Sequence, residues 1–310
     1  MPTLDERLAD AMNASGYEVT ASDARLVPVV SKLECLANRA SFGRLLSDLF
    51  ACNDKSNLHA MLFEAVFAWH FLKKGKDLSY EVVQQPSSGT TVDFLRKPTS
   101  NMHIFYELRL LQQQRRITDL FDEQLKQSPY FGTLLNGSDQ QHEVVRLQQV
   151  LLAKVQDRTG EPIKFFSVDS PNYNVLVVDV TQPLLGMIDK YDCILACYGD
   201  EEVPPHCRRD VFGLFQILSP GAPPPLQEIS RKFDRLRTTI HGILFMRRSR
   251  KSNPIDFELQ CYFVPNRAIL SKEPYDVILA EASEVFPPWK ERTRTHNHRV
   301  HRIANKPGSR

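Results

Sequence analysis

The sequence lacks the features of a secreted or membrane-embedded chain. Its six cysteines are scattered over 310 residues and are too few for a disulfide framework. No apolar run approaches the roughly 20 residues that span a bilayer. The N-terminal stretch MPTLDERLADAMN is acidic and amphipathic, unlike a signal peptide. We therefore expect a cytoplasmic protein of a reducing compartment that makes no membrane contact.

Several catalytic signatures are also absent. The chain has no G-x-S-x-G nucleophile elbow, no Walker loop and no G-x-G-x-x-G. Cys193, Cys197, His206 and Cys207 are residue types that can bind zinc, but no C-x-x-C is present. The first two lie in the apolar stretch YDCILACYG, where small buried cysteines are common. We therefore favour core packing over a zinc site.

The net charge of +2 is unevenly distributed. Residues 290–310 carry a net +6, so the first 289 residues carry −4. A basic terminus of this kind is either a solvated tail or an arm that contacts nucleic-acid phosphates. MRRSRKSN, residues 246–253, is a second basic run. It fits either a solvated hairpin tip or a loop that lies along a nucleic-acid backbone.

Helical and extended patterns alternate along the chain. Apolar spacing predicts helices within 1–50 and over 56–74, 115–127, 142–156, about 186–198 and 226–240. Alternating or continuous apolar runs predict strands over 80–85, 90–95, 102–111, 174–180, 241–248 and 256–264. Short loops between the first three strands suit antiparallel hairpins. The sequence therefore predicts an α/β core with added helices, divided into an N-terminal helical region (1–55), an α/β domain (56–285) and a basic flexible tail (286–310).

Glu64 stands out on the helix predicted over 56–74. Its neighbours at three- and four-residue spacing are Ala60, Met61, Phe67 and Ala68, all apolar. An ionised carboxylate on such a face is costly unless something pairs with it. Taken alone, Glu64 is explained most simply by a face boundary or by a salt bridge to another helix.

Asp93 and Glu107 lie on consecutive predicted strands. Side chains alternate along a strand, so Glu107 shares a face with Arg109. Each position also has an ordinary explanation. Asp93 fits a solvent-exposed face of the sheet, and Glu107 with Arg109 fits a charge pair at the sheet surface. Together they suggest one site. Neighbouring antiparallel strands can bring Asp93 and Glu107 close enough to share a hard cation, and the preceding helix can add Glu64.

The order helix, three antiparallel strands, helix, strand, with D-x₁₃-E-x-[K/R] on the second and third strands, resembles the PD-(D/E)XK restriction-endonuclease-like superfamily. The resemblance covers roughly residues 56–181. It implies a nuclease that uses Mg²⁺ or Mn²⁺ to hydrolyse phosphodiester bonds of nucleic acid, with DNA favoured. Enzymes that cut both strands often pair two active sites, so a homodimer is also compatible with the resemblance.

The resemblance also implies roles for individual residues. Asp93 in TTVDF and Glu107 in YELR match the metal-binding acids, and Glu64 matches the acidic residue of the first helix. The backbone carbonyl of Leu108 matches a further metal ligand. Gln156, at the end of AKVQ, matches a neighbour of the site.

One departure from the family pattern leaves alternatives open. The family's lysine is Arg109 here, and arginine stays protonated, although it can stabilise charge in a transition state. Lys154, on the later helix, is a candidate replacement. Alternatively, the site is catalytically silent and the same fold binds nucleic acid or a protein partner. A third possibility, an α-helical interaction protein, requires Glu64, Asp93 and Glu107 to point apart.

Overall fold

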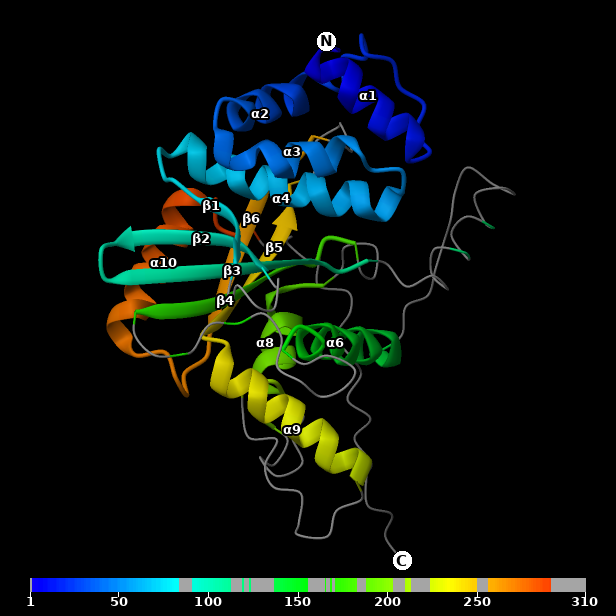
Figure 1. Cartoon of the computed structure of the whole chain (residues 1–310). Coiled ribbons are helices and arrows are strands. Elements are labelled where there is room, and N and C mark those ends of the chain that lie inside the picture. The colour runs from blue at the N-terminus through cyan, green and yellow to red at the C-terminus, as the bar shows by residue number, and fades with distance from the viewer. Residues whose placement is uncertain are drawn as a thin grey trace, which may run out of the picture.

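An open six-stranded sheet with helices on both sides forms the framework of the protein (Figure 1). The computed structural model describes residues 2–83, 91–112, 119, 123, 137–155, 165, 168, 171–182, 188–202, 210–212, 224–249 and 256–290. Within them the strands lie in the order β1-β2-β3-β4-β5-β6, so neighbours in space are neighbours in sequence. The predicted mixed α/β class is confirmed, and the alternative of an α-helical protein is wrong.

The first three strands form the predicted antiparallel hairpins. They are β1 (Ser79–Val83), β2 (Thr91–Thr99) and β3 (Met102–Leu110). The remaining strands are β4 (Asn172–Asp179), β5 (Gly242–Arg248) and β6 (Leu259–Pro265). β3, β4 and β5 run parallel, and β6 pairs with β5 in the antiparallel direction. The parallel centre requires crossover connections, and helices provide two of them.

α4 (Lys55–Lys73) covers one face of the sheet, and the N-terminal helices α1 (Leu4–Ala14), α2 (Val27–Ala37) and α3 (Gly43–Phe50) pack against α4 (Figure 1). α4 begins at Asp54, whose carboxylate accepts the Asn57 N–H at 2.9 Å. Phe67 of α4 packs against Phe94 of β2 and Tyr106 of β3, with ring centroids 5.4 Å away in each case. These contacts fix α4 over the first hairpins.

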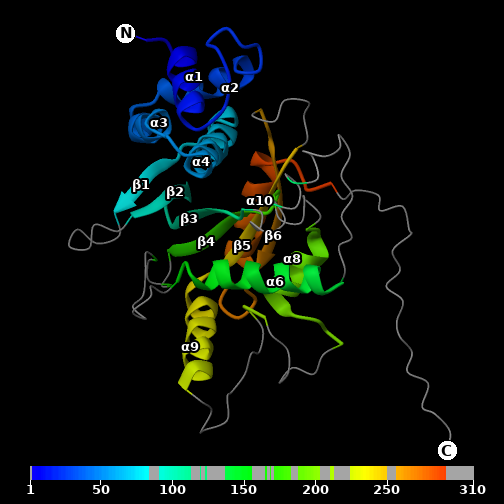
Figure 2. The same cartoon turned by 90° about the vertical axis from the view of Figure 1, so that its right-hand side faces the viewer.

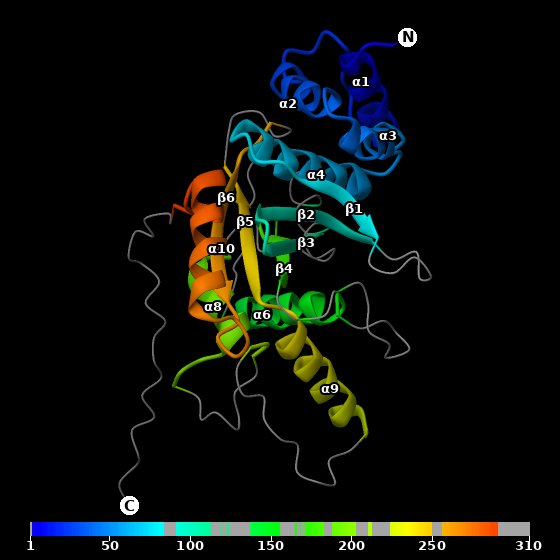
Figure 3. The same cartoon turned by 60° about the vertical axis from the view of Figure 1, so that its left-hand side comes forward.

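The opposite face is covered by α6 (Gly137–Leu152), α8 (Lys190–Tyr198) and α9 (Pro224–Thr239), and Figure 2 shows α4 and α6 on opposite sides of the strands. α10 (Lys272–Val285) lies along β6 (Figure 3). Strand alternation divides β3 as expected, because Tyr106 and Leu108 join the core on the α4 side and Leu111 joins the core on the α6 side.

Two bounds differ from the sequence prediction. α6 ends at Leu152, so Lys154 lies in the turn that follows and not on the helix itself. Residues 286–290, expected to begin the flexible tail, are packed. Phe286 is 1% and Trp289 3% exposed, and the Trp289 N–H donates to the Cys261 carbonyl at 3.0 Å. Large aromatic side chains outweigh the local charge pattern here, because burying them stabilises the fold.

Other expectations meet the structure only in part. Cys193 and Cys197 are buried in the core on the α6 side, as predicted, whereas His206 and Cys207 lie outside the described residues. The helix predicted over 115–127 falls almost wholly outside them, and the tail beyond residue 290 falls outside entirely. Among the helices that are described, none has the length and apolar character needed to cross a membrane.

Candidate functional site

A pocket of about 420 Å³ lies where β3 leaves the sheet, between α4 and α6. α4 contributes Ser56, Asn57 and Glu64, β2 contributes Asp93, and α6 with its following turn contributes Arg146 and Lys154. The floor is the continuous segment 107–112 of β3 and its extension. The crevice beyond the carboxyl end of a strand is a common place for ligands in open α/β sheets.

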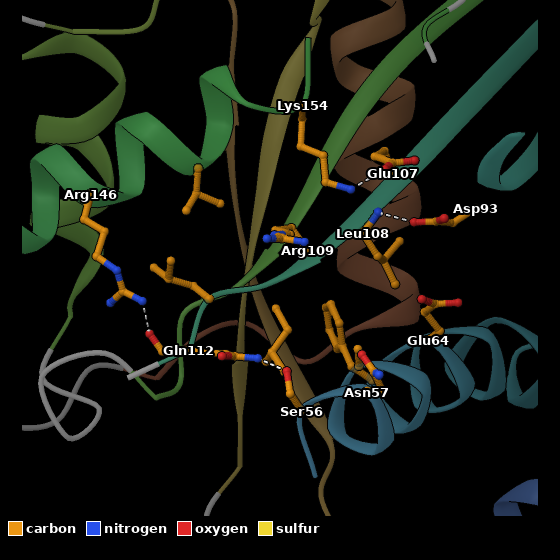
Figure 4. A pocket seen from close by; sticks show the side chains of 15 residues that line it. Ser56, Asn57, Glu64, Asp93, Glu107, Leu108, Arg109, Gln112, Arg146 and Lys154 are labelled. Atoms are coloured by element: carbon orange, nitrogen blue, oxygen red, sulfur yellow. Dashed lines mark hydrogen bonds and ion pairs between the residues drawn. The ribbon is translucent and has the colours of Figure 1, made fainter. Parts of the chain in front are cut away.

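Asp93 and Glu107 face the same side of adjacent strands. Phe94 pairs with Tyr106 across β2 and β3, and both aromatic rings point into the α4 core. The acidic residues on either side of that pair therefore share the other face. The Leu108 N–H donates to Asp93 Oδ2 at 2.6 Å, which fixes the Asp93 carboxylate over β3 (Figure 4).

Lys154 completes this part of the pocket. Its ammonium group forms an ion pair with Glu107 Oε1. The Glu107 side chain is 1% exposed and that of Lys154 is 19% exposed. A carboxylate buried this deeply needs a nearby positive charge, because removal from water disfavours its ionised form. The lysine candidate from the sequence is therefore in contact with one of the two candidate acids.

Glu64 reaches the pocket from α4. The Tyr80 hydroxyl donates to Glu64 Oε2 at 3.1 Å. Burial raises the pKa of Glu64 to about 8, and the neighbouring Asp93 carboxylate adds to the rise. The Tyr80 hydrogen bond works in the opposite direction, and Glu107 adds a smaller upward contribution. Several carboxylates thus crowd one low-dielectric region, an arrangement often found at functional sites.

Arg109 and Leu108 also line the pocket, but they differ in exposure. Arg109 shares the face of Glu107, as predicted, and is exposed to solvent. Leu108 contributes its buried side chain to the α4 core while its backbone lies at the pocket floor. Gln156, the remaining candidate, lies outside the described residues.

Four polar residues that line this pocket were not predicted from the sequence. The Gln112 side-chain amide donates to the Ser56 hydroxyl, and Asn57 lies beside Ser56 on α4. Arg146 Nη2 donates to the Gln112 carbonyl at 2.5 Å, and its Nη1 pairs with Glu143 at 3.1 Å. Helical spacing could have indicated Arg146, because it lies two four-residue steps before Lys154 and therefore on the same face of the helix predicted over 142–156.

The geometry limits what metal site the pocket can form. Within the part of the chain that the structure describes, no three His, Cys, Asp or Glu side chains are placed so that all could ligate one ion. Asp93 and Glu107 remain a pair of oxygen donors on adjacent strands, and Mg²⁺ often takes only one or two carboxylates and keeps waters as its other ligands. Glu64 lines the same pocket and interacts electrostatically with both Asp93 and Glu107.

The structure describes part of the basic run MRRSRKSN, residues 246–253. Arg248 does not lie in a solvated loop, because its side chain is 9% exposed and its Nε donates to the buried Asp179 carboxylate at 2.6 Å. Its guanidinium also stacks 4.1 Å from the Phe257 ring centroid. Arg248 ends β5, as the strand predicted over 241–248 indicates, and its side chain is committed to Asp179 and Phe257. Residues 250–253 lie outside the described part, so both readings of the run stay predictions.

Comparison with known proteins assigns no family to the chain. No family model, curated protein or solved structure matches it. A function for this protein is therefore inferred from the residues of the pocket.

Proposed function

We propose that this pocket hydrolyses phosphodiester bonds of nucleic acid, with DNA as the first substrate to test, on a restriction-endonuclease-like core. The observation that carries the proposal is that Asp93 and Glu107, on adjacent antiparallel strands, line one pocket with a lysine paired to Glu107. This is the set of charges that the D-x₁₃-E-x-[K/R] resemblance requires, with the lysine supplied from a different element.

The oxygen donors of the pocket suit a hard divalent cation, Mg²⁺ or Mn²⁺. Asp93 and Glu107 would hold it, with the Leu108 carbonyl as a further ligand and Glu64 acting through a water. Such an ion lowers the pKa of bound water and offsets charge that grows on a phosphate. A bound cation would also favour the ionised form of Glu64, whose pKa is raised first by burial and then by the neighbouring Asp93 carboxylate.

Lys154 and Arg109 together take the roles of the single lysine in the family pattern, which are to position water and to stabilise charge. The Lys154 ammonium, held by Glu107, positions the attacking water, because an ammonium group offers three donors. Arg109 stays charged and offsets the negative charge that develops on the phosphate. Gln156 remains a predicted neighbour of the site.

Calorimetric Mn²⁺ binding tests the metal site without a substrate. Asp93→Asn removes the charge and keeps an oxygen that accepts the Leu108 N–H, so the fold is preserved. We expect Mn²⁺ affinity to fall at least about tenfold, and divalent-dependent cleavage of DNA to be lost with it. Asp10→Asn, at an exposed position on α1, is the matched control. Mn²⁺ binding and cleavage that are equal in Asp93→Asn and the unaltered protein would refute the assignment.

A catalytically silent protein that binds nucleic acid or a protein partner is the second candidate. The observation in its favour is that the Lys154 ammonium pairs with Glu107, so a side chain of the chain itself balances this carboxylate. It predicts nucleic-acid binding that persists in EDTA, weakens with salt and survives Glu107→Gln. Divalent-dependent cleavage that Glu107→Gln abolishes would exclude it.

A further inference from the structure

The pocket between α4 and α6 is chemically divided. Its three carboxylates lie on one side, Arg146 and Gln112 lie on the other, and Arg109 projects between them (Figure 4). Two apolar residues of the lining, Ala60 and Val150, are partly exposed. The acidic side suits the anionic phosphate of a nucleotide only through the divalent cation of the proposed function, and the apolar residues suit its flat base.

The pocket is small and its key acid is recessed. A volume of about 420 Å³ corresponds to a sphere roughly 9 Å across, too small to enclose a base pair together with its two sugar-phosphate backbones. Glu107, beside which the scissile phosphate must lie, is 1% exposed. A base-paired nucleotide cannot enter such a recess with its partner, whereas an unpaired nucleotide can rotate out of the stack.

The polar groups at the rim suit a base that has lost its partner. Asn57 carries both a donor and an acceptor on its side-chain amide, and Arg146 is held rigidly by Glu143 and the Gln112 carbonyl. Proteins that recognise unpaired bases stack them on apolar surfaces and hydrogen-bond their exposed edges.

We infer that the pocket takes one nucleotide of an unpaired strand, and that the protein acts on single-stranded segments or strand ends in preference to intact duplex. The phosphate lies beside Arg109 and the cation held on the acidic side, and the base packs against Ala60 and Val150 with Asn57 at its edge. This inference rests on the proposed function, since it names the substrate class of the same site.

Fluorescence anisotropy of the full-length protein in Ca²⁺ tests the preference. The probes are a labelled single-stranded DNA, the same strand in a blunt duplex, and that duplex with an unpaired tail. We expect the single strand and the tailed duplex to bind about tenfold more tightly than the blunt duplex, because only an unpaired base can enter the pocket without first breaking a base pair. In Mn²⁺ the same order is expected for cleavage.

Val150→Phe fills the space in which the base is proposed to pack. We expect it to remove most of the tenfold preference for the single strand over the blunt duplex. Gln149→Phe, exposed on the same helix and absent from the pocket lining, should retain it. Competition provides a readout that needs no variant. A deoxynucleoside 5′-monophosphate should displace the single strand from the unaltered protein, whereas inorganic phosphate at the same concentration should not.

Equal binding and equal cleavage of single strand and blunt duplex would overturn the inference and leave the hydrolytic function standing. Loss of preference in both phenylalanine variants, or equal competition by inorganic phosphate, would also overturn it. If Mn²⁺ supports no cleavage of any probe, the proposed hydrolysis fails, and the binding preference in Ca²⁺ still decides the inference.

Discussion

Lys154 and Glu107 form an ion pair although 47 residues separate them in the sequence. Lys154 reaches the pocket from the turn after α6, and Glu107 lies within β3 with a side chain that is 1% exposed. The pair joins a helix on one face of the sheet to a central strand. It therefore contributes both to the charge balance of the pocket and to the placement of α6.

Lys154→Met removes the ammonium that balances Glu107 while keeping most of the apolar stem. We expect the free energy of unfolding at pH 7 to fall by about 3 kcal/mol, the usual consequence of removing one partner of a buried pair. Urea denaturation measures it. Adding Glu107→Gln should recover much of the loss, because the remaining charge is then also removed. If the double variant is no more stable than Lys154→Met, lost packing of the lysine stem is responsible.

Stability is expected to fall in acid through buried histidines. Burial lowers the pKa of His59, His70 and His241 to about 4 in each case. Their folded pKa lies below the unfolded value of about 6.5, so the unfolded state takes up protons first. The stabilisation they provide is therefore complete above pH 6.5 and is lost as the pH falls toward 4, by about 1–3 kcal/mol for each histidine.

A single variant isolates one of these contributions. His70 Nε2 accepts the Leu259 N–H at 3.0 Å, and Gln offers an oxygen in its place without titrating. His70→Gln should reduce the slope of unfolding free energy against pH by up to about one proton between pH 6.5 and 4. His142→Gln, at an exposed position on α6, is the control. An unchanged slope in His70→Gln would contradict the prediction.

Gly242 is required by the close packing of β5 against β6. A Cβ at this position would lie 2.5 Å from two atoms of the Phe263 ring and 3.1 Å from the Val264 carbonyl. Gly242→Ala should therefore lower the free energy of unfolding by about 1–3 kcal/mol, measured by urea denaturation. Phe263→Leu in the same chain should relieve part of the clash. Gly43→Ala, where nothing lies within 4 Å, should have no such cost.

The basic terminus is expected to set the salt dependence of nucleic-acid binding. Truncation after Lys290 removes six Lys and Arg and one Glu, and keeps the buried Trp289. We expect the thermal midpoint to be unchanged and the slope of log affinity against log salt to fall by about 3–5. Truncation after Val285 is the contrasting variant and should destabilise the fold, since it also removes Phe286. An unchanged salt slope after Lys290 truncation would exclude a phosphate-contacting arm.

The sequence by itself determined the local structure. The period-two pattern of 102–111 places Glu107 and Arg109 on one face of β3 because strand geometry allows nothing else. The short hairpin loops determined the antiparallel order of the first strands, and apolar spacing located α4 and its unusual Glu64. Each of these features depends on residues a few positions apart.

Only the tertiary structure decided which distant groups meet. It paired Lys154 with Glu107, gave Glu64 its Tyr80 hydrogen bond, and paired Arg248 at the end of β5 with the buried Asp179. These contacts depend on how α4 and α6 pack on opposite faces of the sheet. The packing is set by the shapes of the two cores as a whole, and no local pattern of charge or hydrophobicity encodes it.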